Sequence, residues 1–390
     1  MKNFVYNNRT ELIFGKSEDK EVAQKIKEHG AKKVLVVYGQ NSVIKSGLLG
    51  RIVEGLKQEK LGFVEYGGVK ANPLRSHAEA GVALAKKEKC DFVLAIGGGS
   101  VIDAAKGIAA GAVNPKMWDF YELDTKVTKA LPIGVVLTLP AAGSEGSGAT
   151  VLVDDVSGTN TKYSFGSDEV RPKISFVNPV NCMTLPKEQI SYGASDIVAH
   201  MLERYFSPQT DVTVTDELLG GAIRAMLKVA PKLYNDSANY EYWAEFCLLG
   251  TLAHNDMLNM GRTAQDWGTH VIENKLLSGP CNIAHGAGLA IIFPAWLKYV
   301  ATKKPSKILQ FVQEVLQIDA KDEKAAIAQG IAKLQEWYQS IGLKLKMSDL
   351  GIQLSDIKDL AKKLFDPNIK LGGYGELTLE EINKILELAK

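Results

Sequence analysis

Hydrophobic and polar positions follow two different rhythms along the chain. Up to about residue 185, short β-branched runs alternate with helical stretches, as in "KVLVVYG" from Lys33, "GFVEYGG", "AEAGVALAKKEKC" and "DFVLAIGGGS". Such alternation is typical of a parallel sheet with crossover helices, whose ligands bind at the carboxyl ends of the strands. The same region predicts strands at "PIGVVLTLP" and "KISFVNP", and a hairpin over "ATVLVDDVSGTNTKYSFG" that turns at "DDVSGTN".

Beyond "TLPKEQ" the apolar residues recur at helical spacing instead. The clearest segments are "DELLGGAIRAMLKVAPKLY", "YEYWAEFCLLGTLAHNDML", "AAIAQGIAKLQEWYQSIG" and "TLEEINKILELA". No repeat of 20 to 50 residues and no low-complexity linker separates the halves. We therefore expect an α/β domain over residues 1–185 and an all-α domain over residues 186–390.

Composition narrows the classes of partner. The 390 residues exceed the size of one typical core, which agrees with two domains. Lys and Arg number 46 against 45 Asp and Glu, so no bulk charge gathers nucleic acid. Apolar runs fall short of the ~18 residues that a membrane span needs, and the start "MKNFVYNNRT" lacks an apolar signal region. We expect a soluble, cytoplasmic protein without nucleic-acid or membrane partners.

The most informative local motif is "VLAIGGGSVIDAAKGIAA". A strand runs into Gly97, Gly98 and Gly99, which let backbone N–H groups approach a phosphate. Ser100 adds a hydroxyl at a helix start, where the helix dipole favours an anion. The motif predicts a pyrophosphate cradle, and the alternative is a plain tight turn between strand and helix. Asp103 lies on the first helical turn and can stabilise the helix start.

The end of an earlier strand offers a candidate site for the adenosine end of a dinucleotide. Gly39, Gln40, Asn41 and Ser42 stand where an acidic side chain commonly holds an unphosphorylated ribose. Here no carboxylate is present, and Lys45 can accept a phosphate. This favours NADPH over NADH, although an ordinary polar loop would explain the stretch equally well.

Candidate metal ligands concentrate in the helical half. Asp196 and His200 in "SYGASDIVAH" lie four residues apart, so they project from the same face of a helix. An isolated pair of this kind is more often a weakly interacting surface pair. His270 and His285 lie in apolar, glycine-bearing stretches, and with the first two they would make a four-ligand site for Fe²⁺ or Zn²⁺. His254 competes for a place but suits a hydrogen-bonded helical histidine better.

Four motifs together resemble a known family. "AIGGGSVIDAAK", "LTLPAAGSE", "GASDIVAHMLE" and "HVIENKLLSGPCNIAHGAGLAIIFPAW", in this order, resemble the iron-containing (type III) alcohol dehydrogenases, particularly their bacterial butanol dehydrogenase and NADPH-dependent aldehyde reductase branch. The resemblance spans essentially the whole chain. It implies a Rossmann-like N-terminal domain, a helical C-terminal domain of the dehydroquinate synthase-like type, and a metal in the cleft between them.

The resemblance also implies roles for individual residues. Metal ligands fall on Asp196, His200, His270 and His285, and the pyrophosphate string falls on Gly97 to Ser100, with Asp103 nearby. The remaining cofactor contacts fall on Gly39, Gln40, Asn41, Ser42, Asn72, Pro73, Thr138 and Lys162. A homodimer is implied as well, with the N-terminal strand "KNFVYNN" as a candidate interface.

Three positions depart from the family pattern. Ala142 stands where many relatives carry threonine, so one hydroxyl contact is lost. The interval from His270 to His285 is one residue longer than in the relatives, which affects the turn at "SGPCN". Asn274 occupies the place of a histidine proposed as a proton shuttle, so solvent, Asp103 or a ribose hydroxyl must complete the proton relay.

The predicted activity is metal-dependent hydride transfer between NAD(P)H and short-chain primary alcohols and aldehydes such as butanol and butanal. A glycerol dehydrogenase-like polyol oxidoreductase and a dehydroquinate synthase-like lyase are alternatives on the same architecture. A sugar-phosphate substrate would require several basic residues beside the metal, and "SDIVAHMLERYF" offers only Arg204. A metal-dependent hydrolase would need the metal but no dinucleotide.

Overall fold

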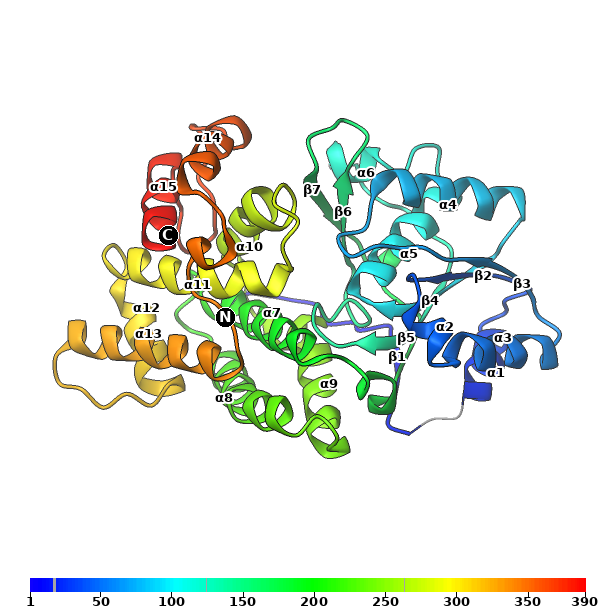
Figure 1. The fold of residues 1–390 in the computed structure, drawn as a ribbon, viewed down its shortest axis with the longest axis horizontal. Helices are drawn as coiled ribbons and strands as arrows, with labels where there is room; N and C mark the ends of the chain where they lie inside the picture. The colour runs from blue at the N-terminus through cyan, green and yellow to red at the C-terminus, as the bar shows by residue number, and fades with distance from the viewer. Residues whose placement is uncertain (17–18, 124, 263) are drawn as a thin grey trace. The chain divides into compact units, whose positions relative to one another are not determined.

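The structure is a computed structural model that describes residues 1–16, 19–123, 125–262 and 264–390. The chain forms two compact units (Figure 1). The first unit comprises Asn7–Thr184. The second comprises Leu185–Lys390 together with Met1–Tyr6.

The first unit is built on a six-stranded parallel sheet with the order β1-β8-β5-β4-β2-β3. The strands are β1 Glu11–Phe14, β2 Lys33–Tyr38, β3 Gly62–Tyr66, β4 Phe92–Gly98, β5 Ile133–Leu139 and β8 Ile174–Val177. The central strands β2, β4 and β5 are buried over most of their length, as the near-continuous apolar runs predict for strands covered on both faces. The predicted parallel sheet is confirmed.

Helices cover both faces of this sheet. The helical segments of the first unit are α1 Asp19–Glu28, α2 Ser42–Lys45, α3 Leu48–Gln58, α4 Arg75–Lys87, α5 Gly99–Ala112, α6 Asp119–Glu122, η1 Asp168–Val170 and η2 Pro179–Cys182. Helices α1 and α3 pack together on one face, over a core that includes Val34, Val36 and Leu94. Helices α4 and α5 pack together on the other side in Figure 1.

A separate antiparallel hairpin completes the first unit. Its strands are β6 Ala149–Asp154 and β7 Thr161–Gly166. The hairpin and its turn lie where the sequence predicts them. The backbone N–H of Val153 in β6 donates a hydrogen bond to the carbonyl of Pro73 at 2.8 Å, which connects the hairpin to the segment before α4.

The strand order places a topological switch beside β2. The chain proceeds from β2 outward to β3 on one side, and then to β4 and β5 on the other. In open parallel sheets, ligands bind beyond the carboxyl ends of the strands at such a switch. The segments after β2, β4 and β5 therefore share one edge of the sheet, and they contain most of the predicted cofactor contacts.

The second unit is predominantly helical, as predicted. Its helical segments are α7 Lys187–Tyr205, α8 Thr213–Asn235, α9 Tyr240–His254, η3 Met257–Asn259, α10 Gly268–Glu273, η4 Asn274–Ser278, α11 His285–Ala301, α12 Pro305–Gln310, η5 Phe311–Val315, α13 Glu323–Ser340, η6 Met347–Leu350, α14 Leu354–Leu364 and α15 Leu379–Leu388. Within the described residues its extended structure amounts to an isolated bridge between Leu371 and Leu377. None of its described helices, nor those of the first unit, is long and apolar enough to cross a membrane.

Helices α7 and α11 form the interior of this unit and lie side by side (Figure 1). Both are buried along almost their whole length. At the start of α11, a Cβ on Gly286 would collide with the backbone carbonyl of Tyr192 in α7. Glycine thus allows the two helices to approach closely, which brings His285 near Asp196, one turn further along α7.

The N-terminal segment differs from the prediction. Residues 1–10 form no strand, and the first strand begins at Glu11. The prediction of a strand at "KNFVYNN" is therefore wrong. The backbone N–H of Lys2 instead donates to the carbonyl of Gly261 at 3.0 Å, and the Met1 side chain packs against the same glycine.

Candidate functional site

Helix α7 carries Asp196 and His200 in a buried position. Both residues are only 4% exposed, and Nδ1 of His200 lies 3.2 Å from Oδ1 of Asp196. An exposed, weakly interacting pair is thus excluded. Burying polar side chains on a helix that is covered all round is unfavourable unless they find partners.

Two further histidines converge on the same carboxylate. Nε2 of His270, from α10, lies 3.8 Å from Oδ1 of Asp196, and Nε2 of His285, from the start of α11, lies 3.6 Å from it. Asp196, His270 and His285 form a group in which one ligand atom from each lies within 4.8 Å of the others, as a metal site requires. We call these three residues the Asp196 cluster.

His200 lies at the edge of the Asp196 cluster. Among the described residues it is not one of the three whose ligand atoms form the close group. Its ring stacks on His254 with 4.4 Å between the ring centroids, and its centroid lies 4.7 Å from that of His270. The structure thus brings three of the four predicted ligands together and places the fourth beside them.

The cluster has the properties of a cation site. Within the part of the chain that the structure describes, Oδ1 of Asp196, Nε2 of His270 and Nδ1 of His200 are buried without a hydrogen-bond partner. These are one carboxylate oxygen and two imidazole nitrogens, the donor types that Fe²⁺ and Zn²⁺ accept. A bound divalent ion would satisfy all three atoms, so the residues fit a metal. His285 is the most accessible member, with its side chain 24% exposed.

The electrostatics of the cluster agree with this fit. Burial opposes the charge of Asp196, but His200 and His285 outweigh that effect and hold its pKa well below the usual range. Burial likewise opposes the charge of His270, yet the neighbouring carboxylates of Asp196 and Glu203 raise its pKa to about 9. The pKa of His200 is lowered by burial despite the neighbouring Asp196. The site therefore favours a negative Asp196 carboxylate with a positive charge on His270 and a neutral His200 ring.

Two buried glutamates, Glu203 and Glu273, were missed by the sequence reasoning. Glu203 accepts a hydrogen bond from Nδ1 of His270 at 2.9 Å, and Glu273 accepts one from Nδ1 of His285. Each glutamate lies three residues after a predicted ligand histidine, His200 or His270, and therefore on the same helical face. That spacing is the signal by which the sequence could have indicated them.

Asn274 begins a π-helical turn, η4, directly after Glu273. It is half-buried, and its Oδ1 accepts a hydrogen bond from Ser278 at 3.5 Å. A π turn holds one more residue than an α turn, so it would accommodate the extra residue between His270 and His285 that the resemblance implies. The prediction that Asn274 interrupts a proton route stays a prediction.

The three glycines at the end of β4 are needed because neighbouring atoms lie very close. A Cβ on Gly97 would lie 2.6 Å from Cβ of Val101, and one on Gly98 would lie 2.8 Å from Cβ of Leu139. A Cβ on Gly99 would lie 3.1 Å from that of Ala142, the position that departs from the family pattern. The tight turn between strand and helix is therefore present. The pyrophosphate cradle at the same glycines stays a prediction.

The other predicted cofactor residues follow neighbouring strands of the sheet. Residues 39–42 come directly after β2, Ser100 lies in the first turn of α5, and Thr138 lies one residue before the end of β5. Gln40, Asn41 and Ser42 are exposed and therefore available to a ligand. Because β2, β4 and β5 are adjacent and parallel, these segments lie at the same edge of the sheet.

Asn72, Pro73 and Lys162 lie around the β6–β7 hairpin rather than on the strand ends. Asn72 adopts a left-handed backbone conformation with φ of 54° directly before Pro73, whose carbonyl accepts from the hairpin. Lys162 lies in β7 opposite Val153, and its charge partly opposes the rise that burial causes in the pKa of Asp103. The hairpin thus brings Lys162 near the helix that begins with the glycine motif.

Asp103 has structural partners on both carboxylate oxygens. Oδ1 accepts from the hydroxyl of Ser144 at 2.6 Å, and Oδ2 accepts from the backbone N–H of Val151 at 3.0 Å. Lys106, one turn later, is fully buried and donates to the Ser144 hydroxyl and to the carbonyl of Ala149, both at 2.7 Å. Burial raises the pKa of Asp103 and lowers that of Lys106 to about 8. These contacts connect α5 to the hairpin, which favours a structural part for Asp103; its predicted catalytic role stays a prediction.

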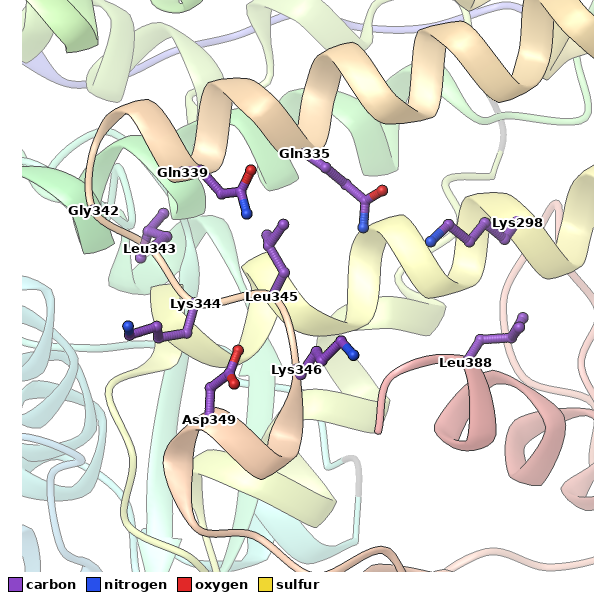
Figure 2. Close-up of a pocket in the computed structure, with 10 residues that line it drawn as sticks. All are labelled: Lys298, Gln335, Gln339, Gly342, Leu343, Lys344, Leu345, Lys346, Asp349 and Leu388. Carbon is purple, nitrogen blue, oxygen red and sulfur yellow. The ribbon is translucent and has the colours of Figure 1, made fainter.

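A pocket of about 570 Å³ lies elsewhere in the helical unit. Figure 2 shows side chains from α11 and α13 and from the loop after α13 around it. Its lining residues are Lys298, Gln335, Gln339, Gly342, Leu343, Lys344, Leu345, Lys346, Asp349 and Leu388. The pocket contains none of the predicted ligands and does not correspond to the Asp196 cluster.

Comparison with known proteins identifies the family. Residues 9–179 match the family model described as iron-containing alcohol dehydrogenase, and residues 190–390 match the model for the C-terminal part of the Fe-containing alcohol dehydrogenase family. The chain belongs to the iron-containing alcohol dehydrogenase family. The predicted family, its two-part fold and the oxidoreductase class of the alcohol dehydrogenases are confirmed.

Relatives within the iron-containing alcohol dehydrogenases cover the whole chain. The chain is 37% identical to the probable NADH-dependent butanol dehydrogenase 1 of Bacillus subtilis, over 99% of each chain. It is 32% identical to the NADPH-dependent aldehyde reductase YqhD of Escherichia coli, over 100% of each. A solved structure of NADH-dependent butanol dehydrogenase A from Thermotoga maritima superimposes with a TM-score of 0.94 at 38% identity, covering 100% of this chain and 99% of the other.

Proposed function

We propose that this iron-containing alcohol dehydrogenase interconverts short-chain primary alcohols and aldehydes, such as butanol and butanal, by hydride exchange with NADPH. The observation that carries the proposal is the buried Oδ1 of Asp196, which lies within 4 Å of nitrogens from His200, His270 and His285. The names of the relatives, butanol dehydrogenases and an aldehyde reductase, support the class of substrate.

In this proposal each unit has its own part. The α/β unit binds the nicotinamide cofactor at the carboxyl edge of β2, β4 and β5, and the helical unit holds one divalent metal, Fe²⁺ or Zn²⁺. Asp196, His200, His270 and His285 would be its ligands. When bound, the metal supplies Lewis acidity that polarises a carbonyl or lowers the pKa of an alcohol, and the nicotinamide supplies or accepts the hydride.

The protein's own residues orient and protect this chemistry. Asp196 provides the negative charge that attracts the cation, and burial in a dry environment strengthens that attraction. The partly exposed His285 marks the side from which a substrate oxygen can approach. An amide such as Asn274 does not exchange a proton usefully, and the Asp103 carboxylate is engaged by Ser144 and Val151, so the proton relay would depend on solvent or on a hydroxyl of the bound cofactor.

The preference for NADPH rests on the segment after β2. Residues 39–47 contain no carboxylate and include Lys45, so a ribose phosphate would meet positive rather than negative charge. Relatives are named for either cofactor, NADH in Bacillus subtilis and NADPH in Escherichia coli, so family membership supports a nicotinamide cofactor without selecting one.

The test is nicotinamide oxidation by the metal-loaded chain with butanal, followed with NADPH and NADH in parallel. The structure provides a sharp variant at Gly39, where a Cβ would meet only ordinary contacts at 3.7 and 3.8 Å. Gly39→Asp should reverse the ratio of kcat/KM for the two cofactors, and Gly39→Asn should change it little because it adds similar volume without charge. No oxidation with any short aldehyde would refute the activity, and an unchanged ratio in Gly39→Asp would refute the cofactor preference.

The alternatives receive less support. Arg204, the basic residue beside the predicted ligands, has its guanidinium 5.0 Å from the Trp267 ring and 3.8 Å from Asp256, so it is not presented for a sugar phosphate. Assays with glycerol would reveal a polyol oxidoreductase, and a hydrolase would act without nicotinamide. A homodimer and a cytoplasmic location stay predictions, which analytical ultracentrifugation and cell fractionation would test.

A further inference from the structure

Two carboxylates behind the Asp196 cluster, Glu203 and Glu273, have side chains that are 0% exposed. Each accepts a hydrogen bond from Nδ1 of a histidine in the cluster, whereas Nε2 of the same ring is the nitrogen near Asp196. Resting on the proposed function, we infer that Glu203 and Glu273 are positioning residues that fix the tautomer and direction of His270 and His285, and thereby set the affinity of the site for its metal.

Glu203 holds His270 through three hydrogen bonds on one oxygen. Its Oε1 accepts from the hydroxyl of Thr269, from the backbone N–H of His270 at 3.1 Å, and from Nδ1 of His270 at 2.9 Å. The backbone carbonyl of Glu203 also accepts from the N–H of Asp266 at 3.0 Å. Glu203 therefore fixes both the ring of His270 and the start of the helix that carries it.

Glu273 holds His285 from the other side. Its Oε2 accepts from Nδ1 of His285 and from the hydroxyl of Ser278 at 2.9 Å. Ser278 is the last residue of the π-helical turn η4, so the turn between the two histidines supplies the second hydrogen bond. Each histidine of the cluster thus has its own buried carboxylate.

The chemical consequence concerns the two ring nitrogens. A neutral imidazole carries one proton, and a ring that donates from Nδ1 must leave the lone pair on Nε2 free. In both rings it is Nε2 that faces Asp196, at 3.8 and 3.6 Å. The glutamates therefore select the tautomer in which the two Nε2 lone pairs point at the same place.

The charge of the pair points to a cation as well. Oε2 of Glu203 and Oε1 of Glu273 are buried and, among the described residues, lack a hydrogen-bond partner. With Asp196 they place three carboxylates around two imidazoles, and the nearby Arg204 supplies one positive charge. An uncompensated buried carboxylate is strongly unfavourable, so a divalent ion offsets what the protein alone does not.

Gly288 provides independent geometric support. It lies in α11 one turn after His285, and a Cβ there would collide with the carboxylate of Glu273, with Cγ at 2.7 Å and Cδ at 2.9 Å. Alanine normally favours a helix over glycine by about 1 kcal/mol. The helix therefore carries glycine at the position where a side chain would displace Glu273.

The asymmetry with His200 sharpens the inference. Its Nδ1, rather than Nε2, is the nitrogen near Asp196, and its ring stacks on His254. Among the described residues this Nδ1 has no hydrogen-bond partner, so His200 lacks the buried carboxylate that holds each of the other two rings. Two ligands are thus held in a fixed tautomer from behind, and the third is held by stacking.

The experiment measures metal affinity, independently of turnover. The full-length chain is stripped of metal, and the Kd for Zn²⁺ is determined by chelator competition for the parent and for Glu203→Gln, Glu203→Ala, Glu273→Gln and Glu273→Ala. Each should bind about 10- to 100-fold more weakly, with the glutamine variants retaining more affinity than the alanine variants because an amide oxygen still accepts from Nδ1. Glu188→Gln, at an exposed position on α7, is the matched control and should bind as the parent does.

Two further readouts separate positioning from folding. With only six histidines in the chain, ¹⁵N-histidine NMR of the metal-free protein at pH 10, above the pKa of about 9 for His270, should show the neutral Nδ1–H tautomer for two rings in the parent and its loss in the corresponding variant. Gly288→Ala and Ser278→Ala act on Glu273 without replacing it, and should weaken metal binding even if Glu273→Gln fails to fold.

The outcomes distinguish this inference from the proposed function. Parent-like Zn²⁺ affinity in all the glutamate variants would overturn the inference alone, provided that Asp196→Asn abolishes binding. A fall in the thermal midpoint with unchanged affinity would overturn it too, because it would show a purely structural part. A parent chain that binds no metal, with or without Asp196, would overturn both the inference and the metal-dependent function.

Discussion

The carboxyl edge of the sheet and the Asp196 cluster are built from different kinds of residue. At the edge, the turn after β4 consists of glycines, and neighbouring side chains pack against it so closely that a Cβ on Gly97 would lie 2.6 Å from Cβ of Val101. In the cluster, the parts are charged and polar side chains on α7, α10 and α11, which meet although up to 89 residues of sequence separate Asp196 from His285.

This difference determines how each region responds to change. The edge is a local motif. Replacing one of its glycines adds volume that distorts the backbone, but it removes no functional group. The cluster is an assembly of buried polar atoms, in which removing one charge leaves the others without a partner. Electrostatic changes should therefore be most severe in the cluster, and steric changes at the edge.

The largest effect is expected for Asp196→Asn, which keeps the shape of the side chain and removes its charge. The three histidines would then face a neutral amide, and the metal would lose its only carboxylate ligand. Turnover should fall by about 10³-fold or more, since metal polarisation contributes several kcal/mol, and metal content should fall with it. Elemental analysis and steady-state rates of the same samples provide the measurement.

Asp211→Asn is the control for this variant, because Asp211 is an exposed aspartate near the start of α8. It should retain both metal and rate. If Asp196→Asn kept its metal and lost only activity, the expectation that the cluster depends on each of its charges for metal binding would be wrong.

A smaller effect is expected in the α/β unit, where the burial of Lys106 should make the free energy of unfolding depend on pH. Its pKa in the folded chain is lowered to about 8 from an ordinary 10.5, mainly by burial. Between these values the unfolded chain binds more protons than the folded one, so the free energy of unfolding rises with pH, by about 3 kcal/mol across the window. Lys106→Met should remove this rise while lowering stability at pH 7, where Ser144 and Ala149 lose their donor.

Denaturant unfolding of both chains from pH 7 to pH 10.5 checks this expectation. Lys344→Met, at an exposed position, should reproduce the pH dependence of the parent. If the free energy of unfolding rose equally with pH in the parent and in Lys106→Met, the buried lysine would not be the cause of the rise.

Gly98→Ala should have the smallest effect on stability but a selective effect on function. Its Cβ would press against Leu139, and overpacking of this kind costs about 1–3 kcal/mol. The KM for the nicotinamide cofactor should rise while the metal content stays that of the parent. Gly50→Ala, where a Cβ would meet no atom within 4 Å, is the matched control in the same unit and should leave both unchanged.

Much of the fold was predictable because its signals are local. The strands at Lys33–Tyr38 and Phe92–Gly98, the hairpin after Ala149 and the change to helical spacing near residue 185 each follow from short-range periodicity. The "GGGS" turn was predictable for the same reason. The N-terminal segment was not, because "KNFVYNN" has the composition of a strand, yet its backbone is engaged by Gly261, far along the sequence.

The cluster could be predicted only in part. The i to i+4 spacing of Asp196 and His200 indicates a shared face, but it does not reveal that α7 is covered all round or that His200 stacks on His254. The glutamates escaped attention because charged residues on helices are usually solvated, and the pairing crosses between elements: Glu203 follows His200 but contacts His270. Spacing indicates which residues share a helix face, whereas only the packing of helices determines which of them meet.

The π-helical turn η4 changes the direction in which the side chains between His270 and His285 point around the helix axis. In an α-helix each residue advances the side chains by about 100°, so two residues five apart point about 140° away from each other. Ser278 nevertheless reaches back five residues to Glu273, because the wider turn reduces that rotation. A single-residue deletion here would therefore do more than shorten a loop: it would rotate Ser278 away from Glu273 and turn a length change into the loss of a hydrogen bond.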